Sequence, residues 1–211
     1  MTSYHMAGNG RVTVTASFKP LRDILPDPLR VGLYFSAPTD FTDISWYGRG
    51  QYESYADRKS GAPIARWQGR IADQNHDYMR PMETGNKADV RWIDIADDKG
   101  RAFRITGAQP LSANILAFPY ADLDRREPGT WRSSDIQPRK AVSLLIDAAQ
   151  VGVGGDTAWS EEARAHGKYR MPLAPLSYSF TTAPTILADD ATGPMRWRTS
   201  SALMPYQPHN R

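Results

Sequence analysis

Two glutamates, Glu53 and Glu83, are the side chains whose type and setting best fit acid–base chemistry. Hydrolysis of a glycosidic bond needs a carboxyl group on each side of that bond, about 5 to 5.5 Å apart when the anomeric configuration is retained. Each glutamate also has arginines close by in the sequence, and a carboxylate paired with arginine can hold a loop in place without reacting. We expect this structural role for both glutamates, with partners among Arg58, Arg80 and Arg91.

Residues 151–160 form a glycine-rich segment that ends close to a tryptophan, V-G-V-G-G-D-T-A-W-S. Three glycines in four positions indicate either positive φ angles or a close approach to another part of the protein. The flat indole of Trp159 suits the C–H face of a sugar ring, whose hydroxyls would bind polar neighbours such as Asp156. The segment therefore predicts a sugar-binding loop. The alternatives are a core role for Trp159 and a dinucleotide loop, but the third glycine and the following strand of a dinucleotide motif are missing.

The other candidates for catalysis are an aspartate and the histidines. Asp57 precedes Arg58, and we expect the two to form a local ion pair that fixes their loop. The four histidines lie far apart: His5, His76, His166 and His209. Their spacing fits neither a zinc site nor a Ser-His-Asp triad, so no metal site is expected. His76 alone lies beside one of the motifs described next.

Three stretches resemble, in order, motifs of one protein family. Residues 46–58 read W-Y-G-R-G-Q-Y-E-S-Y-A-D-R, similar to W-x-G-x-G-P-x-E-N-Y-x-D-R. Residues 78–92 read Y-M-R-P-M-E-T-G-N-K-A-D-V-R-W, similar to Y-x-x-P-Q-E-N-G-N-K-x-D-V-R-W, and the loop 151–160 resembles M-G-V-G-G-D-x-S-W. The family is the last, small-chain domain of bacterial β-galactosidases of the lactose-hydrolysing, family-2 glycoside hydrolase type. Departures from the family motifs include Gln51 in place of Pro, Ser54 and Thr84 in place of Asn, and Ala158 in place of Ser.

The resemblance spans residues 4–182 and implies an antiparallel, two-sheet supersandwich of the kind also found in galactose mutarotases. In this family the catalytic acid and nucleophile belong to a separate (β/α)8 barrel. The resemblance implies that this chain has no catalytic residue and no cofactor, and that it packs on the barrel of a larger β-galactosidase. Trp159 and Asp156 would then contact the galactoside at the mouth of a shared active site. The other marked side chains would hold the loops: Glu53, Asp57, Arg58 and Glu83.

Two other functions stay open at this point. A free-standing carbohydrate-binding β-sandwich would bind galactosides by itself, whereas a lone tryptophan on a rim gives little affinity without the rest of a pocket. A mutarotase-like enzyme would bring a histidine and a carboxylate together in a cleft.

The composition argues against several other classes of protein. The 26 basic and 23 acidic residues give a net charge of +3, and the arginines are mostly scattered singly, so a nucleic-acid site is not expected. The absence of cysteine excludes disulfides and thiolate metal sites. No apolar run is long enough to span a bilayer, and residues 1–10 lack the features of a signal peptide. We expect a soluble protein with no membrane partner; its compartment does not follow from the sequence.

Short strands dominate the sequence pattern. Residues 12–18 alternate between apolar and polar side chains, which is the period of a half-buried strand. Similar runs predict strands at 29–35, 44–47, 90–95, 102–106, 114–118, 142–147 and 176–181. Gly8-Asn9-Gly10 and residues 97–100 are expected as tight turns, and helices only at 120–126 and 160–166. The pattern predicts an all-β antiparallel sandwich. Four tryptophans in or beside the strands are expected in its core: Trp46, Trp67, Trp92 and Trp131.

The two ends of the chain carry further expectations. Residues 4–182 are expected to form the sandwich, and residues 183–211, rich in proline and polar residues, an irregular or disordered tail. The resembling domain has further strands before this point, so a truncated N-terminus is expected. Missing strands would leave an open sheet edge, and open edges recruit other strands. We expect that edge to pair with a second copy of the chain, or to be covered by the tail through Met195–Arg198.

Overall fold

The computed structural model describes residues 1–22, 24–124, 132–138, 141–157 and 160–186, and its regular structure is almost entirely β. The strands of these residues are β1 (Thr2–Met6), β2 (Val12–Phe18), β3 (Arg30–Pro38), β4 (Phe41–Arg49), β5 (Ile64–Arg70), β6 (Lys87–Asp97), β7 (Arg101–Leu116), β8 (Ala141–Gln150) and β9 (Leu176–Ile186). Short 3-10 segments connect them: η1 (Ile71–Asp73), η2 (Tyr120–Asp124), η3 (Ser133–Asp135), η4 (Glu161–Ala163) and η5 (Gly167–Tyr169). All the strand pairs are antiparallel, which confirms the predicted fold class.

The two halves of the sandwich join at β7. One path of paired strands runs β1-β2-β9-β7-β6-β4-β5, and β8 and β3 branch from β7. The first half of β7 pairs with β9, whereas its second half pairs with β8. Between the two halves β7 bulges, because Trp92 of β6 faces Thr106 while Val90 faces Leu111. This irregularity lets one long strand belong to both layers.

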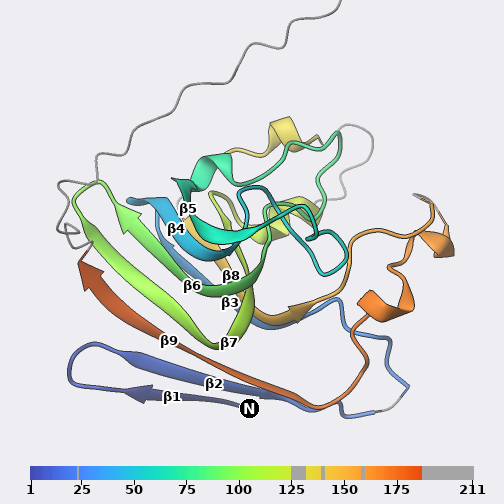
Figure 1. Cartoon of the computed structure of the whole chain (residues 1–211), viewed down its shortest axis with the longest axis horizontal. Coiled ribbons are helices and arrows are strands. Elements are labelled where there is room, and N and C mark those ends of the chain that lie inside the picture. The colour runs from blue at the N-terminus through green and yellow to red at the C-terminus, as the bar shows by residue number, and fades with distance from the viewer. Residues whose placement is uncertain (23, 125–131, 139–140, 158–159, 187–211) are drawn as a thin grey trace, which may run out of the picture.

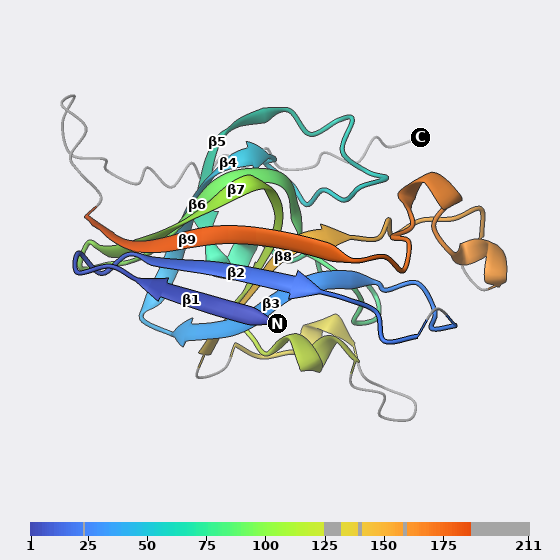
Figure 2. The ribbon, with the colours of Figure 1, turned by 90° about the horizontal axis from the view of Figure 1, so that it is seen from below.

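The two layers pack face to face through aromatic side chains. Phe35 of β3 stacks on Phe180 of β9 with ring centroids 6.4 Å apart, and the Tyr178 hydroxyl of β9 donates to the Ile146 carbonyl of β8 at 2.8 Å. Neither pair of strands is hydrogen-bonded as neighbours, so these contacts cross the core. Figure 1 shows β1, β2 and β9 together below the other strands, and Figure 2, seen from below, shows them in front.

The predicted turns are confirmed. Gly10 closes the β1–β2 hairpin with a φ of 81°, a conformation that favours glycine. In the turn between β6 and β7 the Asp97 carboxylate accepts the backbone N–H groups of Lys99 and Arg101, and Gly100 has a φ of 80°. Turn chemistry read from the sequence therefore places two of the hairpins correctly.

Several predicted elements differ from the structure. The patterns miss β1 and β5, since every residue of β1 is exposed and β5 has no buried residue. The strands expected at 102–106 and 114–118 are parts of one strand, β7, because a bulge rather than a turn separates them. Where helices are expected at 120–126 and 160–166, the described residues form only the 3-10 segments η2 and η4.

The tryptophans divide into different environments. Trp46 is 1% exposed in the core, and Trp67 packs against the core from β5. The expectation of core packing is wrong for Trp92, which is half-buried and has the Arg104 guanidinium 4.2 Å from its ring centroid. Trp131 lies outside the described residues. The partly exposed ring of Trp92 is stabilised by a cation–π contact rather than by burial.

Three strands lie at edges of the described sheet. Within the described residues β1, β3 and β5 each pair with a single strand, and the pairing of an edge with a second copy stays a prediction. β1 begins at Thr2 and β9 ends at Ile186, so the strands extend past both expected bounds, 4 and 182. Met195–Arg198 lies outside the described part of the chain.

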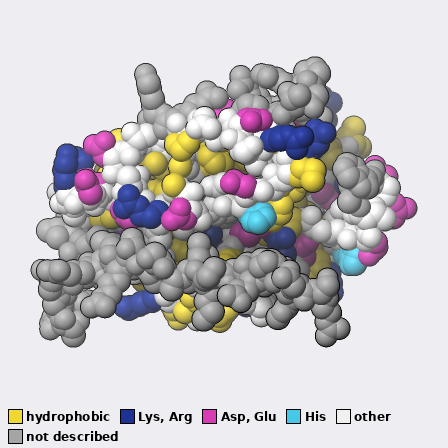
Figure 3. All heavy atoms as spheres, turned by 90° about the horizontal axis from the view of Figure 1, so that it is seen from above, with side chains coloured by type: hydrophobic (Ala, Val, Ile, Leu, Met, Phe, Trp, Pro, Cys, Tyr) yellow, Lys and Arg dark blue, Asp and Glu magenta, His cyan; other side chains and the backbone are white. Residues whose placement is uncertain are grey.

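Basic and acidic side chains are interspersed on the face of the molecule in Figure 3. No described helix could cross a membrane.

Candidate functional site

The three segments that carry the sequence motifs meet at one end of the sandwich. Segment 46–58 leaves β4, segment 78–92 leads into β6, and segment 151–160 follows β8. Glu53 of the first accepts the backbone N–H of Gly85 of the second at 2.8 Å. Asp57 of the first accepts the backbone N–H of Gly154 of the third, also at 2.8 Å. We call these joined loops, residues 50–58, 76–86 and 151–157, the loop cluster.

Glu53 is the main hydrogen-bond acceptor of the loop cluster. Its donors come from two of the three segments: the side chains of Arg58, Tyr78, Thr84 and Tyr55, and the backbone of Gly85. Burial by itself raises the pKa of Glu53, but the hydrogen bonds from Tyr78 and Gly85 and the charge of Arg58 outweigh burial, so the pKa is lowered. Glu53 is therefore held as an anion that joins the loops, with Arg58 as one of its partners.

Asp57 connects the first loop to the glycine-rich loop. Its Oδ2 accepts from Gly154, and a Cβ at Gly152 would lie 2.7 Å from the Asp57 carboxyl carbon. The expected ion pair between Asp57 and Arg58 is wrong, because Arg58 pairs with Glu53 instead. No glycine of the 151–157 loop has a positive φ, so close approach is what requires glycine at positions 152 and 155.

Glu83 has partners that the sequence does not predict. Its Oε1 accepts from Asn114 at 3.2 Å and lies 3.5 Å from a nitrogen of Arg30, and its Oε2 accepts from the Tyr120 hydroxyl at 2.9 Å. Among the described contacts, none joins Glu83 to its expected partners: Arg58, Arg80 and Arg91. Burial, with the Glu83 charge adding to it, raises the pKa of Tyr120 to about 12. Glu83 therefore fixes the start of β6 against β3 and β7.

Next to Glu83 lies a buried acid–base pair that sequence reasoning missed. Asp147, at 2% exposure, has its Oδ2 3.2 Å from the Nε of Arg30. Burial raises the pKa of Asp147 to about 7, although the charge of Arg30 acts in the opposite direction. The one available signal is an acid at the end of the apolar run of β8. Its partner lies 117 positions earlier in the chain, which no local pattern reveals.

The predicted sugar-binding loop is only partly described. Asp156 is exposed, its Oδ1 lies 2.8 Å from the Nε2 of His166, and its backbone N–H donates to the carbonyl of Glu162 at 2.7 Å. Trp159 and Ala158 lie outside the described residues. The structure therefore places Asp156 on an exposed loop beside a histidine, and the position of Trp159 beside it stays a prediction.

Two of the departures from the family motifs make loop hydrogen bonds. The Ser54 hydroxyl accepts the backbone N–H of Ala88 at 3.0 Å, and the Thr84 hydroxyl accepts that of His76 at 2.7 Å. Both side chains are buried. The short hydroxyl side chains thus satisfy one backbone group of the loop cluster and one at the start of β6.

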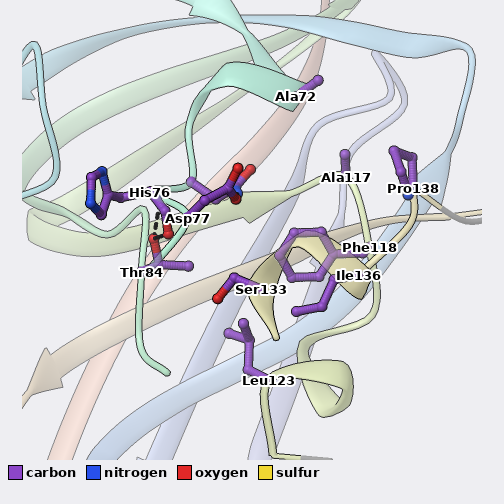
Figure 4. A pocket seen from close by; sticks show the side chains of 11 residues that line it. Ala72, His76, Asp77, Thr84, Ala117, Phe118, Leu123, Ser133, Ile136 and Pro138 are labelled. Carbon is purple, nitrogen blue, oxygen red and sulfur yellow. Dashed lines mark hydrogen bonds between the residues drawn. The ribbon is translucent and has the colours of Figure 1, made fainter. Parts of the chain in front are cut away.

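His76 lies at the border of a pocket of about 170 Å³, shown in Figure 4. Phe118, Ile136 and Thr84 also line it. Figure 4 shows the imidazole of His76 directed away from Ser133 and Phe118, and its ring packs edge-on against Tyr78 at 4.5 Å. Among the described residues no three His, Asp or Glu side chains are grouped to hold a metal ion.

Comparison with known proteins identifies the family. The model of the family described as "Beta galactosidase small chain" matches residues 1–182. The β-galactosidase of Priestia megaterium is 33% identical over 184 residues, which are 86% of this chain and 17% of that protein. β-Galactosidase BgaC of Bifidobacterium adolescentis is 34% identical over 157 residues (72% and 14%), and the β-galactosidase of Lactobacillus delbrueckii subsp. bulgaricus is 34% identical over 162 residues (76% and 15%).

These comparisons also bear on the extent of the chain. It spans about a sixth of the length of the curated relatives it matches, since the matched share of each is 17%, 14% or 15%. It corresponds to a part of those longer polypeptides. With its all-β antiparallel sandwich and its match over residues 1–182, the chain belongs to the β-galactosidase small-chain family.

Proposed function

We propose that the chain is a non-catalytic part of a β-galactosidase that acts on terminal β-galactosides such as lactose. In this proposal the loop 151–160 completes the rim of an active site whose acid and nucleophile belong to the catalytic barrel. The observation that carries the proposal is the loop cluster: three motif segments far apart in the sequence are held together at one end of the sandwich by Glu53 and Asp57. A rim that meets another domain requires loops fixed in this way.

The state of the glutamates supports a non-catalytic role. A general acid in glycoside hydrolysis needs a raised pKa so that it is protonated when the bond breaks. The pKa of Glu53 is lowered instead, and both of its oxygens accept hydrogen bonds from the loops. Both oxygens of Glu83 are likewise hydrogen-bonded, to Asn114 and Tyr120. These partners support a role for both carboxylates in holding the loops.

The glycine-rich loop supports a role at a rim. Gly152 and Gly154 lie against Asp57, and Gly155 lies against the backbone of residues 162–164. Two of the glycines in residues 151–157 are therefore closely packed, and a loop held in this way loses little entropy when it binds a substrate. The exposed carboxylate of Asp156 precedes Trp159 and offers hydrogen-bond acceptors to sugar hydroxyls.

A chimera tests the rim directly. In the β-galactosidase of Priestia megaterium the matching 184 residues are replaced by this chain, and Trp159→Ala is made in the chimera. If the indole is a stacked wall, substrate or acceptor binding weakens by about 1 to 3 kcal/mol, or roughly 5- to 150-fold, while the chemical step changes less. The measurement is KM and kcat for a chromogenic β-galactoside, with added sugar acceptors.

The matched control is Trp92→Ala, which removes an indole from β6 that packs on Arg104. It is expected to leave KM near that of the unmodified chimera. An unchanged KM and unchanged acceptor dependence in Trp159→Ala would overturn the rim proposal.

A further inference from the structure

A groove is lined in part by the first two loops of the loop cluster and by no residue of the loop 151–157. Its volume is about 550 Å³, within the range of small-molecule sites. It is bounded by the loop 51–53, by the end of β5 and by residues 73–78, and β4 and β6 form its floor. Because residues 151–157 do not line it, a ligand in this groove would not contact the loop that carries Asp156.

The floor of the groove carries a buried ammonium group. Lys87 is 2% exposed, yet it lines the groove, and its Nζ lies 5.3 Å from the ring centroid of Trp46. The indole is fixed in turn, because its N–H donates to the Arg49 carbonyl at 2.9 Å. Within the described residues Nζ makes one hydrogen bond, to the Gly85 carbonyl at 3.0 Å. An ammonium has three donors, so two of them have no hydrogen-bond partner within the described residues.

The walls of the groove are rich in amides. The side chains of Gln51 and Gln68 are exposed and make no hydrogen bond within the described part of the chain. Gln74 and Asn75 lie nearby, and each donates to only one neighbouring oxygen. Amides both donate and accept hydrogen bonds, as the hydroxyls of a sugar do. Tyr52 adds an aromatic side chain that is 76% exposed, a suitable surface for the apolar face of a sugar ring.

The charges favour a neutral ligand over an anion. The negative charge of Glu53 acts on the ammonium group of Lys87. The oxygens of Glu53 already accept hydrogen bonds from Tyr78 and Gly85 of the loop cluster. Burial lowers the pKa of Lys87 to about 8, and the charge of Glu53 limits that decrease. Asp73 also lines the groove. A second negative charge brought by a ligand would therefore meet carboxylates as well as the ammonium group.

We propose that this groove is a second ligand site, which binds a neutral sugar through the ammonium group of Lys87, the amides of Gln51 and Gln68, and the ring of Tyr52. The proposal rests on the groove alone and does not depend on the proposed function. In a complete β-galactosidase such a site would retain or sense sugar away from the loop 151–160.

The test is an NMR titration of the purified 211-residue chain with three neutral sugars, galactose, lactose and glucose, and with the anionic sugar galacturonate. We expect saturable binding in the millimolar range, with shifts of the Trp46 indole N–H and the Gly85 amide, because few contacts are available to a small sugar. Gln68→Ala is expected to weaken binding about threefold and Lys87→Met about tenfold, since the second variant removes a charged donor. Gln137→Ala, an exposed glutamine outside the groove, is the matched control and should change nothing.

Several outcomes would overturn the proposal. These are no saturable shift with any of the three sugars, shifts confined to residues 151–157, or binding that appears with galacturonate alone. Lys87→Met keeps the apolar stem over Trp46, and its fold is checked by circular dichroism. If that variant does not fold, Gln68→Ala at an exposed position carries the test. The rim proposal is measured by hydrolysis in the chimera, so the failure of one proposal is distinguishable from the failure of the other.

Discussion

Asp147→Asn is expected to make the protein more stable above pH 7 and to change its stability little near pH 4. The pKa of Asp147 is raised from 3.8 to about 7 in the folded chain, so between these pH values the folded state binds the proton that the unfolded state has released. The unfolding free energy contributed by this group therefore falls as the pH rises through that window. At about 1.36 kcal/mol per pKa unit, the difference in pKa corresponds to roughly 4 kcal/mol of unfolding free energy. We expect the difference in stability between the two proteins to change by on the order of 3 kcal/mol across this pH range.

The measurement is the free energy of unfolding by urea from pH 4 to pH 8 for both proteins. Asparagine keeps the shape of the side chain. Arg30 still has a carboxylate partner in the variant, because the Oε1 of Glu83 lies 3.5 Å from a guanidinium nitrogen of Arg30. Asp156→Asn is the matched control, because that carboxylate is 72% exposed and its removal should give no comparable trend. A difference between Asp147→Asn and the natural sequence that is the same at every pH would contradict this account.

Glu53→Ala is expected to destabilise the chain by about 2 to 3 kcal/mol at neutral pH, because it leaves several donors of the loop cluster without their acceptor. Arg58 is half exposed, so water can replace Glu53 as its hydrogen-bond partner in the variant. This limits the loss of stability. The pH dependence has the opposite sign to that of Asp147. Since the pKa of Glu53 is lowered, its contribution is present above the ordinary glutamate pKa of 4.5 and is lost as the pH falls through the folded value.

Thermal or urea unfolding at pH 7, together with hydrogen exchange of the Gly85 amide, measures this effect. The amide donates to Glu53 and should exchange faster in the variant. Glu161→Ala is the control, since this carboxylate is 90% exposed and lies 3.6 Å from Arg164, and such pairs contribute little. Equal stability of the two variants would show that Glu53 does not hold the loops.

The fold could be predicted where one face of a strand is buried. Residues 12–18 alternate because Val14 is buried in the core while Thr15 is exposed, and the pattern identifies β2. β1 could not be found in this way, since all its side chains are exposed and its strand form depends on pairing with β2. The apolar pattern predicts two strands at 102–106 and 114–118, whereas the structure has one strand, β7, which pairs with β6 on both sides of a bulge.

The site could be predicted as motifs but not as contacts. Glycines 152, 154 and 155 mark a loop that something must approach closely, and the structure supplies Asp57 as part of that contact. Arg30 and Glu83 are 53 positions apart, and Asp57 and Gly154 are 97 apart. Such pairs depend on the order of strands in the sheets, which periodicity does not encode. Lys87 was likewise part of a matched motif, but its burial became evident only from the packing of β4 against β6.

Hydrolysis of a chromogenic β-galactoside by the purified chain tests the central claim most directly. Three samples are compared: the chain alone, the Priestia megaterium β-galactosidase without its matching 184 residues, and the chimera that contains this chain. We predict turnover by the chimera only, because in the proposed function the catalytic barrel supplies the acid, the nucleophile and their positioning. Turnover by the chain alone that persists through further purification and is abolished by Glu53→Gln would contradict the account.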